Sequence, residues 1–191
     1  MNIPNQLTLL RIVLIPCFVA VFYLPVEWSR PGATLLFTLA AITDWLDGYL
    51  ARRLEQQSQL GAFLDPVADK LMVAVVLVVL VQQDPTLWMV LPAAVIIGRE
   101  ITISALREWM AQLGARAKVA VSVLGKVKTI AQMLALIFML LADSLGVVNT
   151  YFTGFLLLYL AATLTLWSMC QYLLAAWPEL RDPRHSGGGA P

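Results

Sequence analysis

Six long apolar stretches run along the chain, and short polar or Pro/Gly-containing segments separate them. About 20 mainly apolar residues are enough to cross a bilayer as a helix. Proline, glycine or a polar cluster stands in each separating segment, where a helix is expected to end. The pattern therefore predicts six transmembrane helices, over Leu7–Leu24, Ala33–Leu50, Leu60–Val81, Leu87–Ala105, Val123–Ala142 and Tyr151–Trp177.

The composition supports a membrane protein. Of the 191 residues, 60% are hydrophobic and 13% are charged, and the mean hydropathy is +0.78. Soluble domains are about 45–50% apolar and about 25% charged. The composition excludes a soluble enzyme, a disordered chain and a nucleic-acid binder with a large basic field. We expect an all-α, polytopic membrane domain over residues 1–182 and a disordered, glycine-rich tail over 183–191.

Basic residues indicate the orientation. If both termini are cytoplasmic, twelve of the thirteen Lys and Arg residues fall on the inner side, and only Arg30 falls on the outer side. Cytoplasmic segments of membrane proteins carry such an excess. The sequence therefore predicts a multi-pass protein with both termini in the cytoplasm.

Four aspartates interrupt the second and third apolar stretches. An isolated charge at mid-span costs roughly 2.5–3.5 kcal/mol on insertion scales. At about 100° per residue, Asp44 and Asp47 share one helix stripe, and Asp65 and Asp69 share another. Two antiparallel helices joined by a short segment would bring the stripes face to face. We expect a polar cavity, open to the cytoplasmic side, that binds something positive.

Carboxylate oxygens without His or Cys suit Mg²⁺ or Mn²⁺ rather than zinc. Two such ions about 3.5–4 Å apart could stabilise the attacking and leaving oxygens of a displacement at phosphorus. The spacing of the four aspartates leaves two other interpretations of their role open. One is a network of ion pairs between the acids and Arg52, Arg53 and Lys70. The other is a proton or cation pathway, since membrane carboxylates often mark those.

The spacing of these acids resembles the signature of the CDP-alcohol phosphotransferases, D-x2-D-G-x2-A-R-x8-G-x3-D-x3-D. All eight fixed positions are present within 26 residues: Asp44, Asp47, Gly48, Ala51, Arg52, Gly61, Asp65 and Asp69. The resemblance implies a six-helix membrane enzyme, usually a homodimer. Such an enzyme uses divalent metal ions to transfer a phosphate-linked group from a CDP-linked donor to an alcohol, and it releases CMP.

The resemblance also implies roles for individual residues. Asp69 resembles the general base that takes the proton of the acceptor hydroxyl. The implied metal ligands are Asp44, Asp47, Asp65 and Asp69, and the implied contacts to the cytidine diphosphate are Gly48, Arg52 and Ser58.

A polar edge on the first predicted helix is a further candidate for contact with the donor. Asn5, Thr8 and Arg11 recur at every third position and so lie on one helix face. Contact with the nucleotide or its phosphates is one interpretation. Helix capping and snorkelling of the arginine to the membrane surface are the others.

Over nearly the whole chain, from Asn2 to about Asp182, the resemblance is closest to bacterial members that use CDP-diacylglycerol and sn-glycerol 3-phosphate. It rests on residues 2–11, 99–108 and 125–129 as well as on the signature. It implies the bacterial inner membrane as location, with the active site facing the cytoplasm.

Basic residues at the cytoplasmic ends of the fourth and fifth helices fit an anionic acceptor, because they would offset the desolvation of a phosphate dianion. They could instead be membrane anchors or bind lipid headgroups. The candidates for binding glycerol 3-phosphate are Arg99, Arg107, Lys126 and Lys128.

The sequence therefore predicts a phosphatidyltransferase that acts on glycerol 3-phosphate. A transferase with another acceptor (serine, inositol phosphate or phosphatidylglycerol) and a cation transporter are the alternatives. Pro66, between two of the acids, would kink the third helix or delay its start.

Overall fold

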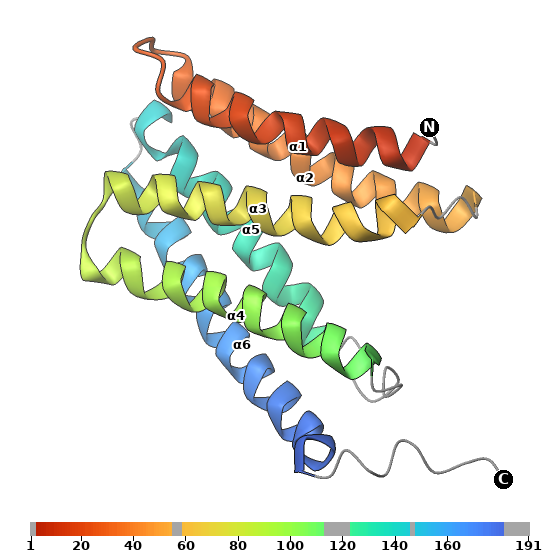
Figure 1. Cartoon of the computed structure of the whole chain (residues 1–191). Helices are drawn as coiled ribbons and strands as arrows, with labels where there is room; N and C mark the ends of the chain where they lie inside the picture. Colours follow the sequence, from red (N-terminus) through yellow and green to blue (C-terminus); the bar gives the residue numbers. More distant parts are fainter. Residues whose placement is uncertain (1–2, 55–58, 113–122, 146–147, 182–191) are drawn as a thin grey trace, which may run out of the picture.

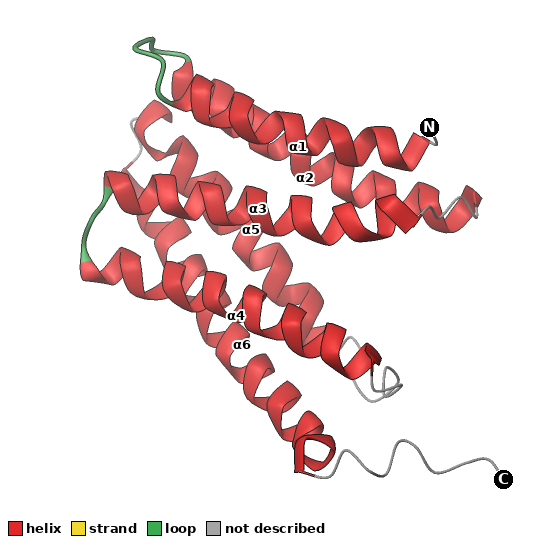
Figure 2. Ribbon diagram, viewed as in Figure 1, coloured by secondary structure: helices red, strands yellow, loops and turns green. Residues whose placement is uncertain are grey.

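Each apolar stretch corresponds to one α-helix of the computed structural model (Figure 1), although α1 ends at Phe22, two residues before the predicted end at Leu24. The structure describes residues 3–54, 59–112, 123–145 and 148–181. These residues form α1 (Ile3–Phe22), α2 (Ser29–Leu54), α3 (Gln59–Gln83), α4 (Leu87–Gln112), α5 (Val123–Leu145) and α6 (Val148–Arg181). Within the described ranges the chain holds no strand (Figure 2). The all-α prediction is confirmed, and α2, α4 and α6 extend past their apolar stretches because polar residues continue the helix.

The helices alternate in direction, so the start of α1 and the end of α6 lie at the same end of the bundle (Figure 1). At the opposite end, residues 23–28 join α1 to α2 and residues 84–86 join α3 to α4. In the second turn, the Thr86 carbonyl accepts the backbone N–H groups of Met89 and Val90 at 3.0 Å each. These bonds begin α4 immediately after Pro85, a residue that favours such a turn.

One apolar core connects all the helices. α5 packs along α6, α1 lies against α2 and α3, and α4 and α2 pack on α6 and α5 respectively. A buried side chain from each helix contributes to this core: Phe18, Phe37, Leu77, Ile96, Leu136 and Leu158. The core fixes the helices that carry the candidate site.

The outer surface of the bundle is strongly apolar. Large side chains such as Leu35, Val78 and Ile130 are about 60% exposed, at 59%, 59% and 61% respectively. Soluble monomers rarely expose contiguous apolar surface of this kind. Among the described residues, Leu87–Met110 and Thr150–Leu174 are long and apolar enough to cross a membrane. These features indicate a membrane location.

The late start that Pro66 suggested for the third helix is not seen, since α3 begins at Gln59 and continues through position 66. The predicted tail, residues 183–191, lies outside the described residues.

Close packing of α5 on α6 depends on Gly154. A Cβ atom there would lie 2.7 Å from Met139 Cγ and 2.9 Å from the Ala135 backbone oxygen. We expect Gly154→Ala to lower the free energy of unfolding by about 1–3 kcal/mol, because backbone atoms must shift. Thermal unfolding in detergent micelles measures this. Gly98→Ala is the matched control, since no atom lies within 4 Å of its Cβ position; equal losses in both variants would contradict the packing argument.

A hydrogen bond fastens the turn between α3 and α4 to the start of α6. The Tyr151 hydroxyl donates to Asp84 Oδ2 at 2.6 Å. This bond is the main reason that the pKa of Asp84 lies below its ordinary value of 3.8; burial acts in the opposite direction, and hydrogen bonds from Thr86 add to the lowering. The charged carboxylate is therefore the form that the fold stabilises.

We expect Tyr151→Phe to lower stability by about 1 kcal/mol near neutral pH. Because folding lowers the pKa of Asp84, this contribution is complete above the ordinary value of 3.8 and is lost as the pH falls through the folded-state value. The difference between wild type and Tyr151→Phe should therefore shrink in acid. Thermal unfolding as a function of pH measures it. Tyr159→Phe is the control, because the Tyr159 hydroxyl donates to the backbone oxygen of Trp88 at 2.7 Å, and that acceptor does not titrate. A pH-independent difference for Tyr151→Phe would contradict the argument.

Candidate active site

Asp69, the predicted general base, forms an ion pair between α3 and α1. Arg11 Nη1 lies 2.5 Å from Asp69 Oδ1. The Arg11 side chain is 3% exposed and the Asp69 side chain is 39% exposed. The guanidinium is thus held inside the bundle, while the carboxylate remains open on one side. This burial contradicts the snorkelling interpretation of Arg11 and supports its placement beside the reacting groups.

The alternative interpretation of the aspartates, a network of ion pairs, predicted Arg52, Arg53 and Lys70 as their partners. Asp69 pairs with Arg11 of the first helix, and Lys70 donates a hydrogen bond to the Ser104 hydroxyl of α4. The expected pairing of the acids with Lys70 is therefore wrong for Asp69. Sequence spacing within the second and third helices gave no sign that the first helix supplies the counter-ion.

Thr8 confirms the orientation of the polar edge of α1. It is fully buried, one turn before Arg11, whereas Leu9 and Leu10 are exposed. The face that carries Thr8 and Arg11 therefore points into the bundle.

The remaining predicted donor and metal residues cannot be placed in the same way. The side chains of several candidates lie outside the described residues: Asn5, Asp44, Asp47, Gly48, Arg52, Ser58, Asp65, Arg107 and Lys126. Among the described side chains, no group of three or more His, Cys, Asp or Glu residues could hold a metal ion. The helices α2 and α3 that carry the four aspartates contact each other. The convergence of these acids stays a prediction.

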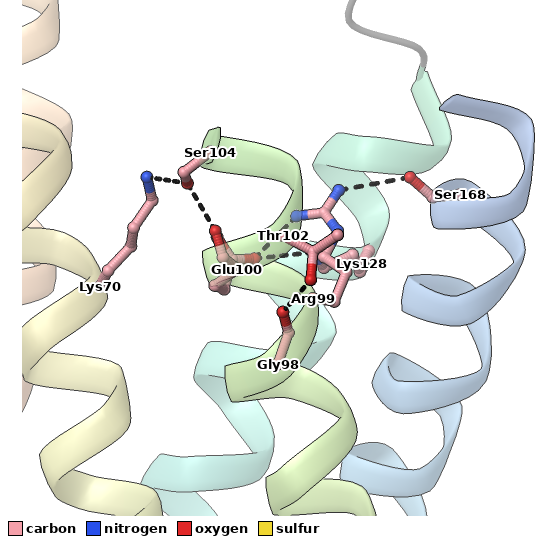
Figure 3. A network of polar contacts seen from close by, with 8 residues as sticks. All are labelled: Lys70, Gly98, Arg99, Glu100, Thr102, Ser104, Lys128 and Ser168. Atoms are coloured by element: carbon pink, nitrogen blue, oxygen red, sulfur yellow. Dashed lines mark hydrogen bonds and ion pairs between the residues drawn. The ribbon is translucent and has the colours of Figure 1, made fainter. Parts of the chain in front are cut away.

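Arg99 and Lys128 meet at one carboxylate (Figure 3). Glu100 Oε1 accepts from Arg99 Nη1 at 2.7 Å and from Lys128 Nζ at 3.1 Å. Arg99 Nη2 also donates to Ser168 Oγ at 3.3 Å. We call Arg99, Glu100, Lys128 and Ser168 the Glu100 cluster; it joins α4, α5 and α6. Two of the four predicted acceptor-binding residues therefore lie side by side.

The Glu100 cluster carries an excess of positive charge in a buried place. The side chains of Arg99 and Lys128 are 10% and 5% exposed, and both contact the same oxygen of Glu100. Arg99 Nε is buried and has no hydrogen-bond partner within the described part of the chain. Buried polar groups are normally hydrogen-bonded. The cluster therefore retains capacity to bind an anion.

Sequence reasoning missed the roles of Glu100 and Ser168. Glu100 had a usable signal, because an acid inside an apolar helix needs a cationic partner. Ser168 had none, since a serine in an apolar helix is often bonded only to its own backbone.

Comparisons with known proteins agree with this arrangement. A family model described as CDP-alcohol phosphatidyltransferase matches residues 1–167. The chain belongs to the CDP-alcohol phosphatidyltransferase family. The match covers every candidate residue named above except Ser168, which follows it by one position.

Two similar relatives of the CDP-alcohol phosphatidyltransferase family carry the same name, CDP-diacylglycerol–glycerol-3-phosphate 3-phosphatidyltransferase. The relative from Pseudomonas fluorescens is 59% identical over 182 residues, which are 95% of this chain and 93% of the relative. The relative from Escherichia coli (strain K12) is 56% identical over 181 residues, which are 95% of this chain and 98% of the relative. The resemblance noted from the signature is confirmed, and CDP-alcohol phosphatidyltransferases generally use divalent metal ions.

Proposed function

We propose that this chain transfers the phosphatidyl group from CDP-diacylglycerol to sn-glycerol 3-phosphate and releases CMP. The product is phosphatidylglycerol phosphate. The observation that carries this assignment is the 56–59% identity, over 95% of the chain, to relatives named for the same transfer. The buried cations of the Glu100 cluster add a physical reason for an acceptor that carries a phosphate.

The proposed metal site consists of Asp44, Asp47, Asp65 and Asp69. All four donors are carboxylates, a set that fits Mg²⁺ or Mn²⁺. When bound, the divalent ions would neutralise charge on the pyrophosphate and lower the pKa of the acceptor hydroxyl. In the proposal the cytidine diphosphate contacts Gly48, Arg52 and Ser58, with Asn5 and Thr8 on the facing side of α1.

Asp69 acts as the general base in this proposal. Arg11 fixes one of its oxygens at 2.5 Å, and its partly exposed carboxylate can reach a substrate hydroxyl. Asp69 takes the proton from the C1 hydroxyl of glycerol 3-phosphate, and that oxygen attacks the phosphorus of the phosphatidyl group. The bond from this phosphorus to the CMP oxygen breaks, and CMP leaves.

The Glu100 cluster binds the acceptor phosphate. Arg99 offers its unpaired Nε and Lys128 offers its ammonium group, both already brought together on α4 and α5. Arg107 and Lys126 add positive charge on the same two helices. A neutral acceptor would gain nothing from this charge, which is why we favour glycerol 3-phosphate over serine.

In this proposal all six helices cross the bacterial inner membrane, and both termini and the active site face the cytoplasm. Exposed tryptophans near both ends of the bundle support the spanning arrangement, because tryptophan favours the membrane interface. Trp28 and Trp88 are 56% and 67% exposed at one end, and Trp109 and Trp177 are 37% and 55% exposed at the other. We also propose a homodimer, as is usual in the family.

The test is a reaction of the purified protein with CDP-diacylglycerol, Mg²⁺ or Mn²⁺, and one acceptor at a time. We expect CMP and phosphatidylglycerol phosphate with glycerol 3-phosphate, and neither product after chelation of the metal. CMP release only with serine, inositol phosphate or phosphatidylglycerol would assign another acceptor. Charge movement across sealed vesicles without CMP release would identify a cation transporter instead.

A further inference from the structure

A groove between α3 and α4 borders the Glu100 cluster, because Glu100 is one of the residues that line it. Figure 1 shows these two helices diverging from the turn at residues 84–86. The groove between them has a volume of about 390 Å³, within the range of about 300–1,000 Å³ that small-molecule sites occupy. Leu71 and Ala74 of α3 and Ile97 and Ile101 of α4 make most of its wall apolar.

One lysine lies at the polar end of this groove. Lys70 Nζ donates to the Ser104 hydroxyl, which in turn donates to the backbone oxygen of Glu100 at 2.5 Å. Figure 3 shows Lys70 reaching from α3 to this position on α4. Within the described part of the chain no carboxylate pairs with Lys70, so its charge faces a neutral hydroxyl. A partly buried cation without a counter-ion is costly and attracts an anion.

The groove and Asp69 lie on different sides of α3. Asp69 points to Arg11 of α1, whereas Lys70 points to Ser104 of α4. Consecutive residues of a helix point about 100° apart, which explains the separation. The groove is also open outward, because Leu71 and Ile101 are 47% and 66% exposed. A molecule in the groove would therefore contact both the protein and the surrounding lipid.

We propose that this groove binds one anionic phospholipid of the surrounding membrane, a lipid distinct from the one consumed in the reaction. An acyl chain packs against Leu71, Ala74 and Ile97, and the phosphate accepts a hydrogen bond from the Lys70 ammonium group. The apolar wall accounts for the acyl chain. The charge of Lys70, which no carboxylate among the described residues neutralises, selects an anionic headgroup over a zwitterionic one. This inference does not depend on which acceptor the enzyme uses.

Native mass spectrometry of the full chain tests the headgroup. The protein is released from micelles that contain equal amounts of dioleoylphosphatidylglycerol and dioleoylphosphatidylcholine. We expect wild type to retain one phosphatidylglycerol in preference to phosphatidylcholine. Lys70→Gln should weaken this preference about fivefold, the effect of one basic residue near an anionic lipid surface, and Lys70→Arg should keep it. Arg30→Gln removes a basic residue of α2 that does not line the groove and should leave the preference unchanged.

A second pair of variants tests the groove itself. Ala74→Phe fills it and should abolish retention of either lipid, whereas Ala94→Phe adds the same side chain at an exposed position of α4 that does not line the groove. The proposal is overturned if wild type shows no preference, if Arg30→Gln acts like Lys70→Gln, or if Ala74→Phe still retains lipid. It is also overturned if wild type is a lipid-free dimer that Ala74→Phe separates, because a second copy would then cover the groove.

Discussion

Asp69→Asn should reduce turnover on the order of 10²–10⁴-fold, the usual contribution of a general base. Asparagine keeps the size of the side chain but cannot accept the proton of the acceptor hydroxyl. It also removes one of the four carboxylates proposed to bind the metal. The rate of CMP release with saturating CDP-diacylglycerol and glycerol 3-phosphate measures the effect.

The same substitution leaves Arg11 with a neutral partner, so folding must be measured separately. Arg11 is 3% exposed, and we expect a lower unfolding temperature but a monodisperse protein. Glu108→Gln is the matched control, because Glu108 is an exposed acid of α4 outside the site; it should turn over at the wild-type rate. Near-normal turnover in folded Asp69→Asn would remove Asp69 as the base.

The helices were predictable from hydropathy because each one contains a long apolar stretch. Their ends were less predictable. α4 continues to Gln112 and α2 to Leu54, since polar residues extend a helix once it leaves the apolar layer. The late start of α3 that Pro66 suggested was wrong, because a helix that is packed on its neighbours tolerates a missing backbone hydrogen bond better than an isolated one.

The site was predictable to the extent that it depends on spacing along one helix. The signature placed Asp69 and the charge pattern selected Arg99 and Lys128, but neither could show which residues meet across helices. Arg11 is 58 residues from Asp69, and Glu100 is 28 residues from Lys128. Such pairs depend on how α1 packs on α3 and how α4, α5 and α6 are arranged, and local patterns do not encode these distances.

Glu100→Leu should have the largest effect on stability. The change removes the Glu100 carboxylate that Arg99 and Lys128 both contact, and removing one partner of a buried ion pair costs about 3–5 kcal/mol. We expect about 3 kcal/mol, the lower end, because the Glu100 side chain is 25% exposed and water can reach part of the cluster. The apparent unfolding temperature in detergent micelles measures the loss, and Glu108→Leu controls for the helix position.

A second substitution separates the structural role of the Glu100 cluster from its binding role. Lys128→Met added to Glu100→Leu removes one of the two cations that contact Glu100 in the wild type, so the double variant should regain part of the lost stability. The KM of the double variant for glycerol 3-phosphate should remain above the wild-type value, because Lys128, a proposed ligand of the phosphate, is gone. If the double variant regained stability and also had the wild-type KM for glycerol 3-phosphate, Lys128 would be a structural residue only. If the double variant were less stable than Glu100→Leu, the two cations would not share Glu100 as their counter-ion, and the charge argument for an anionic acceptor would fail with it.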